Sequence, residues 1–180
     1  MKTANNDGIE RSKERIRQTG EVFTPLPLID EILGKLDQSL FTDPSKTFLD
    51  NSCGSGNFLV RVVAHKIANG STAEEALSTT YGVDLMADNV SHCRARLLTN
   101  AFFAAELWKK RKPAPHLTVE QEREIGMFPD HDDFARKYNH IVNRNIVQHD
   151  ALTYDYTFNE PDETTSTDAV QEKLKKMGLV

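Results

Sequence analysis

Two acidic residues stand where short apolar segments end, and a glycine-rich turn follows the first of them. Asp50 ends the first segment and is followed by Gly54 and Gly56, whereas Asp84 ends the next segment. Glycine adopts positive φ angles and has no side chain, so a ligand can approach the backbone closely there. A carboxylate at the end of the following strand can accept hydrogen bonds from both ribose hydroxyls. The sequence therefore predicts a site for an adenosine-type ligand.

The glycine turn alone also fits an ordinary connection between a strand and a helix. The dinucleotide fingerprint Gly-x-Gly-x-x-Gly is not met, because position 59 is Leu. Asp84 favours the ligand site over the ordinary connection, since it lies about thirty residues after Asp50, as in nucleotide-binding strand–helix–strand units.

Hydrophobic patterning predicts an α/β chain. We expect strands at residues 47–50, 81–85 and 145–148, and helices at 58–69, 87–110 and 118–125. Asn57 is the expected cap of the first helix, and a capping box from Ser71 to Glu74 predicts a short helix before the second strand. Pro25 and Pro27 open an N-terminal helix. Its apolar stripe predicts core packing and contains Leu28, Ile29, Ile32, Leu33, Leu36 and Leu40.

Four motifs occur in one order along the chain: Gly-Glu-Val-Phe-Thr-Pro at 20–25, the turn at 49–58, Gly-Val-Asp-Leu at 82–85 and Asn-Ile-Val-Gln-His-Asp-Ala-Leu at 145–152. In this order the chain resembles the S-adenosylmethionine-dependent DNA methyltransferases that modify adenine N6. It is most similar to the modification subunits of restriction systems. The similarity extends roughly from residue 11 to residue 158.

The resemblance implies a truncated Rossmann-like S-adenosylmethionine-dependent methyltransferase fold with N-terminal helices. It also implies that the cofactor is S-adenosyl-L-methionine or S-adenosyl-L-homocysteine. The first motif would close over the methionine end, the third would hold the ribose, and the acid of the fourth would contact the adenine amino group. The implied cofactor-binding residues are Phe23, Thr24, Pro25, Asp50, Cys53, Gly54, Gly56, Asn57, Phe58, Asp84, Leu85, Asp150 and Ala151.

The catalytic motif of that family, Asn/Asp/Ser-Pro-Pro-aromatic, has no counterpart in the sequence. No Pro-Pro dipeptide occurs, and the nearest similarity, at residues 159–162, lacks the second proline and the aromatic residue. Base flipping requires such a pocket. We therefore expect no catalytic residue in this chain, and a cofactor-binding protein whose methyl transfer is completed by a partner chain or lost.

Three other functions or origins remain open at this point. The chain could be a non-catalytic regulator or decoy that acts on restriction–modification machinery. It could also be an enzyme that consumes S-adenosylmethionine. Finally, the 180 residues could be a fragment cut from a longer protein.

Composition bounds the organisation of the chain. Its 180 residues predict an N-terminal helical segment at 1–46, a cofactor-binding α/β domain at 47–158, and an acidic linker with a C-terminal helix at 159–180. Cys53 and Cys93 are expected to be packing residues of a cytoplasmic protein without disulfides. No apolar stretch predicts a membrane span.

Charge and chemistry limit the expected partners. The net charge of −5 disfavours DNA binding by the chain alone, because phosphate contacts need a basic surface. His131, Asp132 and Asp133 are expected to form a solvated turn, and no metal site is expected.

In the family's sheet a fourth strand pairs with the first, and no such strand follows here. We therefore expect strand 47–50 to be an exposed edge that recruits a second copy or a complementary methyltransferase subunit, unless residues 152–158 cover it.

Overall fold

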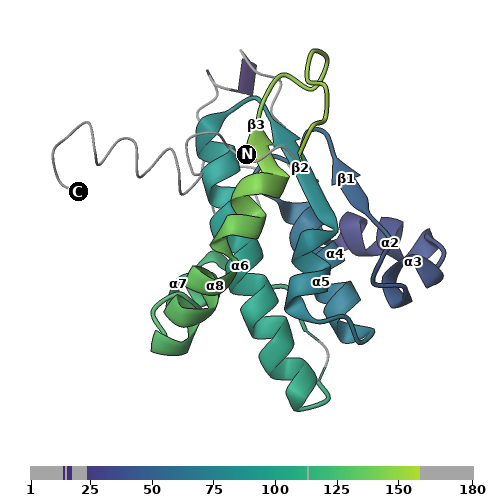
Figure 1. Cartoon of the computed structure of the whole chain (residues 1–180), viewed down its shortest axis with the longest axis vertical. Coiled ribbons are helices and arrows are strands. Elements are labelled where there is room, and N and C mark those ends of the chain that lie inside the picture. Colours follow the sequence, from purple (N-terminus) through teal and green to yellow (C-terminus); the bar gives the residue numbers. More distant parts are fainter. Residues whose placement is uncertain (1–13, 15, 18–23, 113, 159–180) are drawn as a thin grey trace, which may run out of the picture.

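The protein is α/β, with a small parallel sheet and helices before and between its strands (Figure 1). The computed structural model describes residues 14, 16, 17, 24–112 and 114–158. The strands are β1 (Phe48–Asp50), β2 (Thr80–Asp84) and β3 (Ile146–Gln148). The helices are α2 (Leu26–Lys35), α3 (Ser39–Thr42), α4 (Asn57–Ala68), α5 (Ala73–Ser78), α6 (Ala87–Lys109), α7 (Val119–Ile125) and α8 (Pro129–Asn145).

The three strands are parallel and lie in the order β1-β2-β3. Asp50 is the register partner of Gly82, and Asp84 is the partner of Gln148. All three carboxyl ends therefore meet at one edge of the sheet, as the predicted ligand site requires. Each predicted strand is present, with bounds shifted by no more than two residues at either end.

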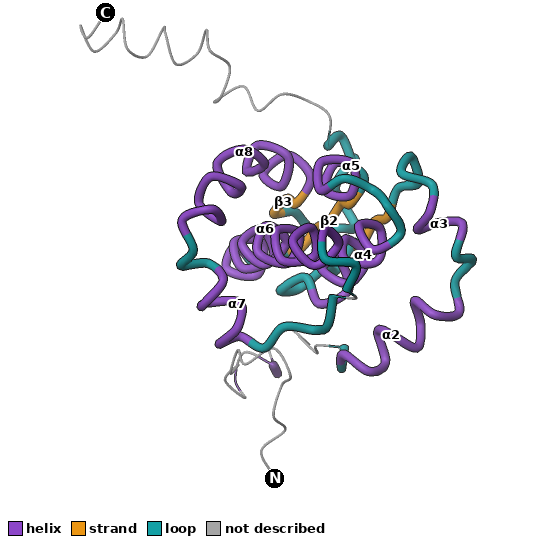
Figure 2. The backbone as a smooth tube through the Cα atoms, turned by 90° about the horizontal axis from the view of Figure 1, so that it is seen from below, coloured by secondary structure: helices purple, strands orange, loops and turns teal. Residues whose placement is uncertain are grey.

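Helices α4 and α6 pack against each other across one face of the sheet, and Figure 2 shows them side by side. Gly82 of β2 allows α4 and the glycine turn to lie close to the sheet, because a Cβ at this position would lie 2.8 Å from Leu59 Cδ1 and 3.0 Å from Cys53 Sγ. Leu59, Val63, Leu97 and Ile146 belong to one buried cluster between the helices and the strands. A parallel sheet needs such cover, since it is normally buried.

The N-terminal helices pack on the outer side of α4. Ile29 and Leu33 of α2 form a second apolar cluster with Phe41 of α3 and Val62 of α4. The predicted core stripe is only partly buried: Leu28, Ile32 and Leu36 are each more than a third exposed. Helix α2 also ends at Lys35, before the last residues of the predicted stripe.

The predictions for the start of α5 and for residues 131–133 were wrong. The capping box begins at Thr72, whose side chain accepts from the backbone of Glu75, because α5 starts one residue later than predicted. Residues 131–133 lie within α8, which the sequence analysis missed. This helix has a polar surface and begins at Pro129, a favourable first helical position.

His131 consequently contacts the interior of the helical layer. Its Nε2 lies 3.1 Å from Thr99 Oγ1, and its ring packs edge-on against Phe102. Its Nδ1 is buried with no hydrogen-bond partner among the described residues. Burial lowers the pKa of His131, and the nearby charge of Asp132 opposes this only in part.

We expect acidification to destabilise the fold through His131. The unfolded chain binds more protons than the folded chain between the lowered pKa and the ordinary value of about 6.5. The free energy of unfolding should therefore fall as the pH falls through that window. Urea unfolding measured above and below the window should show a weaker pH dependence in His131→Phe than in wild type. Equal pH dependence would exclude this role of His131.

Candidate functional site

The glycine turn between β1 and α4 has the backbone geometry that the sequence predicted. Gly54 and Gly56 have φ angles of 52° and 87°. The backbone N–H of Cys53 donates to the oxygen of Val83 at 3.0 Å, and the N–H of Gly56 donates to the oxygen of Cys53 at 2.8 Å. The turn is thus tied to β2 and closed on itself.

The two glycines have different surroundings. Gly54 is partly exposed, whereas Gly56 is buried. A Cβ on Gly56 would lie 2.6 Å from Cys93 Sγ, so the close packing of the turn against α6 requires a residue without a side chain at this position. Of the two, Gly54 is the position that a ligand can approach.

Asp84 holds the turn against the start of α6. Its Oδ2 accepts from the backbone N–H of Gly54 at 2.9 Å. Its Oδ1 accepts from the N–H of Met86 at 2.9 Å and from Asn89 Nδ2 at 3.1 Å. A carboxylate has about four acceptor positions, and three are occupied here. To accept from both hydroxyls of a ribose, Asp84 would have to release one of these bonds.

Asp50 is the less occupied of the two acids. Its Oδ1 accepts from the backbone N–H of Ser52 at 3.1 Å. Burial raises the pKa of Asp50; the bond from Ser52 opposes this shift, and the charge of Asp84 adds to it. The two carboxylates are therefore close enough to interact, and a cationic ligand group beside Asp50 would relieve their repulsion.

Cys53 serves packing, as the sequence predicted. It is buried beside Cys93, and both thiols are free. Its hydrogen bond with Cys93 and its burial raise the pKa of the Cys53 thiol, so the thiolate needed for nucleophilic attack is disfavoured.

Asn57 is the first residue of α4 and not its cap. Gly56 occupies the cap position in a left-handed conformation. The Asn57 side chain is instead buried, and its Nδ2 lies 3.5 Å from the backbone oxygen of Thr24. Thr24 and Pro25 therefore lie near the turn at the start of α2, whereas Phe23 lies outside the described residues.

The remaining predicted residues form the rim beyond β2 and β3. The backbone N–H of His149 donates to the oxygen of Asp84 at 3.1 Å, which joins the two strand ends. Leu85 is 62% exposed, and Asp150 and Ala151 lie in the loop after β3. The structure thus brings the second, third and fourth motifs to one edge.

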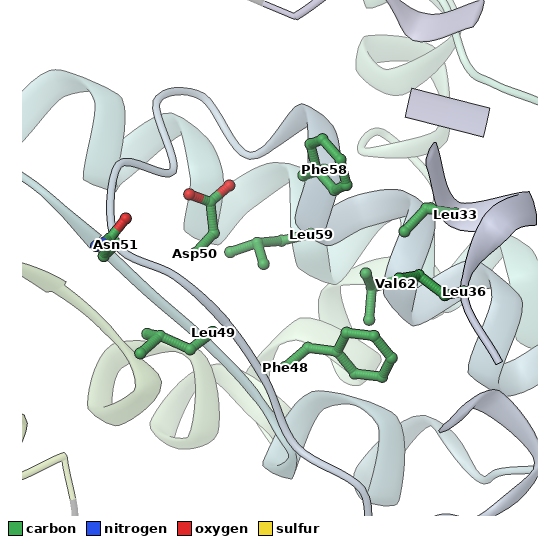
Figure 3. A pocket seen from close by; sticks show the side chains of 9 residues that line it. All are labelled: Leu33, Leu36, Phe48, Leu49, Asp50, Asn51, Phe58, Leu59 and Val62. Atoms are coloured by element: carbon green, nitrogen blue, oxygen red, sulfur yellow. The ribbon is translucent and has the colours of Figure 1, made fainter. Parts of the chain in front are cut away.

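A groove of about 290 Å³ runs along the free side of β1 (Figure 3). Asp50 and Asn51 lie at one end, and Leu33 of α2 and Leu36, which follows α2, form the far side. Apart from Asp50 and Asn51 the lining is apolar, and it includes Phe48, Leu49, Phe58, Leu59 and Val62. This groove separates α2 from the strand.

Sequence analysis missed two buried polar residues that contact the site, Asn89 and Arg96. They share the inward side of α6 with Cys93 and Asn100. Polar residues at helical spacing within an apolar face were the available signal.

The basic run at the end of α6 lies far from this edge. Helix α6 starts beside Asp84 and runs for 23 residues, which corresponds to about 35 Å, so Lys109, Lys110 and Arg111 lie at the opposite end of the molecule. Among the described residues, no group of histidine, cysteine and acidic side chains could hold a metal ion, and no helix is long and apolar enough to span a membrane. The residues at 159–162 lie outside the described part.

Comparisons with known proteins returned no relative. No family model matches the chain, and no curated protein or solved structure does.

Proposed function

We propose that the chain is an S-adenosylmethionine-binding protein of the DNA adenine-N6 methyltransferase type, with a Rossmann-like fold. One observation carries the proposal: the turn at 51–56 and the acids Asp50 and Asp84 meet at the carboxyl edge of a parallel sheet. Ligands bind at this edge in open α/β sheets.

The chemistry of the residues at this edge fits this cofactor. Asp50 supplies a negative charge next to the groove, which suits the cationic methionine end of the ligand. Asp84 supplies acceptors for ribose hydroxyls once the bond from Gly54 is released. The exposed Leu85 and the loop with Asp150 and Ala151 offer an apolar contact and an acceptor for adenine.

Calorimetry on the purified chain tests the proposal. S-adenosylhomocysteine and S-adenosylmethionine should both bind, and both should raise the melting temperature, because a ligand that binds only the folded state stabilises it. Adenosine and methionine, given separately, should bind more weakly than the joined ligand. Neither heat nor a thermal shift with the two cofactors would reject the proposal.

The chain alone should not methylate DNA. The sequence has no Pro-Pro-aromatic loop to hold a flipped adenine, and its basic residues at 109–111 lie about one α6 length from the cofactor edge. Radiolabelled S-adenosylmethionine incubated with adenine-containing DNA should leave the DNA unlabelled. Label in the DNA with pure protein would show that a catalytic group has been overlooked.

A partner chain fits the free side of β1. Within the described residues β1 pairs with β2 alone, and Leu49 is 54% exposed. Residues 152–158 do not pair with it; the ring of Phe158 packs instead on Tyr81 of β2. Unpaired strand edges recruit other strands. We therefore propose that a second copy, or a subunit that carries the missing catalytic loop, adds to this edge, and that DNA is bound only in such a complex.

Light scattering tests this assembly. The wild-type chain should associate as its concentration rises, and Leu49→Lys should weaken association, because charge on an edge strand opposes pairing. Leu152→Lys is the matched control, since Leu152 is 93% exposed but lies in the loop after β3. A chain that stays monomeric, with slow hydrogen exchange along β1, would contradict self-association and leave only a different subunit as partner.

A further inference from the structure

Arg96, in the middle of α6, places its guanidinium against the glycine turn. Its Nη1 donates to the backbone oxygen of Ser55 at 2.9 Å, to the Ser55 hydroxyl at 3.3 Å and to Asn57 Oδ1 at 2.7 Å. Ser55 is fully buried, and Arg96 itself is only 9% exposed. One side chain from α6 thus fixes the second half of the turn.

The charge of this buried guanidinium is neutralised by a residue from α7. Arg96 Nε donates to both carboxylate oxygens of Glu122, at 3.1 and 2.9 Å, and both side chains are about nine-tenths buried. Asn100 Nδ2 supports the same carboxylate at 2.8 Å. Arginine stays protonated, and an unpaired buried charge is costly, so the contact with the turn depends on Glu122.

Arg96 also fixes the orientation of the Asn57 amide. A guanidinium has donors only, so the Asn57 atom that faces it is the carbonyl oxygen. The amide nitrogen of Asn57 is therefore directed to the backbone oxygen of Thr24. Through Asn57, Arg96 connects the turn to Thr24, which belongs to the motif that the resemblance implies to close over the methionine end of the cofactor.

We infer that Arg96 is a positioning residue for the cofactor edge, and that Glu122 of α7 acts through it. The inference rests on the proposed function, in that the positioned turn would meet S-adenosylmethionine. It assigns to α7, which lies between β2 and β3 in the sequence, a role in setting the shape of the glycine turn. Neither residue is proposed to touch the ligand.

A purely structural role would predict different behaviour. If the pair only holds α6 against α7, a variant with methionine at both positions should keep the stability, the turn exchange and the affinity of wild type. Well-packed apolar residues often substitute for a buried ion pair. If Arg96 positions the turn, Arg96→Met/Glu122→Met should fold well but leave the turn unfixed. Arg96→Lys keeps the charge, but a single ammonium cannot replace a planar fork that donates in two directions.

Hydrogen exchange on the ligand-free chain gives the first readout. The N–H groups of Gly54 and Gly56 donate within the site, and they should exchange about tenfold faster in Arg96→Lys and in the double methionine variant. Arg94→Lys is the matched control on the same helix. Its guanidinium donates to the oxygens of Asn143 in α8 and Ile146 at the start of β3, and in this variant the turn should exchange at the wild-type rate.

Affinity for S-adenosylhomocysteine gives the second readout. It should fall about tenfold in both Arg96 variants, which corresponds to about 1.4 kcal/mol, and stay unchanged in Arg94→Lys. Wild-type turn exchange in a folded Arg96→Lys protein would overturn the inference. Fast turn exchange in that variant, together with no binding by wild type, would uphold the positioning role and reject the proposed cofactor. If the double variant does not fold, Arg96→Lys decides alone.

Discussion

Replacing Gly56 with alanine should lower the free energy of unfolding by about 3 kcal/mol. Two costs add at this position. A side chain at a φ of 87° is strained by about 1–2 kcal/mol. The new Cβ would also lie 2.6 Å from Cys93 Sγ, and overpacking typically costs about 1–3 kcal/mol. Urea unfolding followed by circular dichroism measures the sum.

Two other glycines separate the two costs. Gly70 has a φ of 102°, but a Cβ at this position would meet nothing within 4 Å, so Gly70→Ala should show the strain alone, about 1–2 kcal/mol. Gly34 lies in α2 with open space around it, so Gly34→Ala should be neutral or slightly stabilising.

Cys93→Ala supplies the rescue for Gly56→Ala. Removing Sγ opens the space that the new Cβ needs, so the double variant should be less destabilised than the sum of the single changes. Additive losses would mean that the turn moves away from α6 and that Cys93 does not dictate the glycine.

The sheet and its two main helices could be predicted because their signals are local. Helix α4 follows from apolar residues at helical spacing after a glycine turn, and α6 ends where basic residues precede Pro113. Helix α8 was missed because it is mostly polar and is held by packing against α6, which depends on tertiary structure.

The candidate site was predictable in its parts but not in its contacts. Residue type and strand order placed Asp50, Gly54 and Asp84 at one edge, because parallel strands bring their carboxyl ends together. The bond from the Gly54 N–H to Asp84 and the bond from Arg96 to Ser55 join residues that lie 30 and 41 positions apart in the sequence. No local pattern encodes such distances.

Asp84→Ala should have the second large effect, and it should act on both stability and binding. It removes the acceptors of Gly54, Met86 and Asn89 from a buried position. Hydrogen bonds to a charged group contribute about 1.5–3 kcal/mol each, and donors left unsatisfied add to the loss, so unfolding should become easier by at least about 3 kcal/mol. Binding of S-adenosylhomocysteine should weaken by about 1.5–3 kcal/mol if Asp84 holds the ribose.

Asp84→Asn separates these roles, because it keeps the shape but replaces one acceptor oxygen with a donor. The remaining amide oxygen can accept either from the turn or from the start of α6. The new NH₂ group cannot accept, and it then faces the N–H group that has lost its acceptor. Asp43→Asn is the control: Asp43 also accepts a backbone N–H, from Ser45, but lies in the loop after α3. Calorimetry at a temperature where each variant is folded then isolates affinity from stability. Wild-type affinity in folded Asp84→Asn would assign Asp84 to holding the turn, and the ribose would need another acceptor.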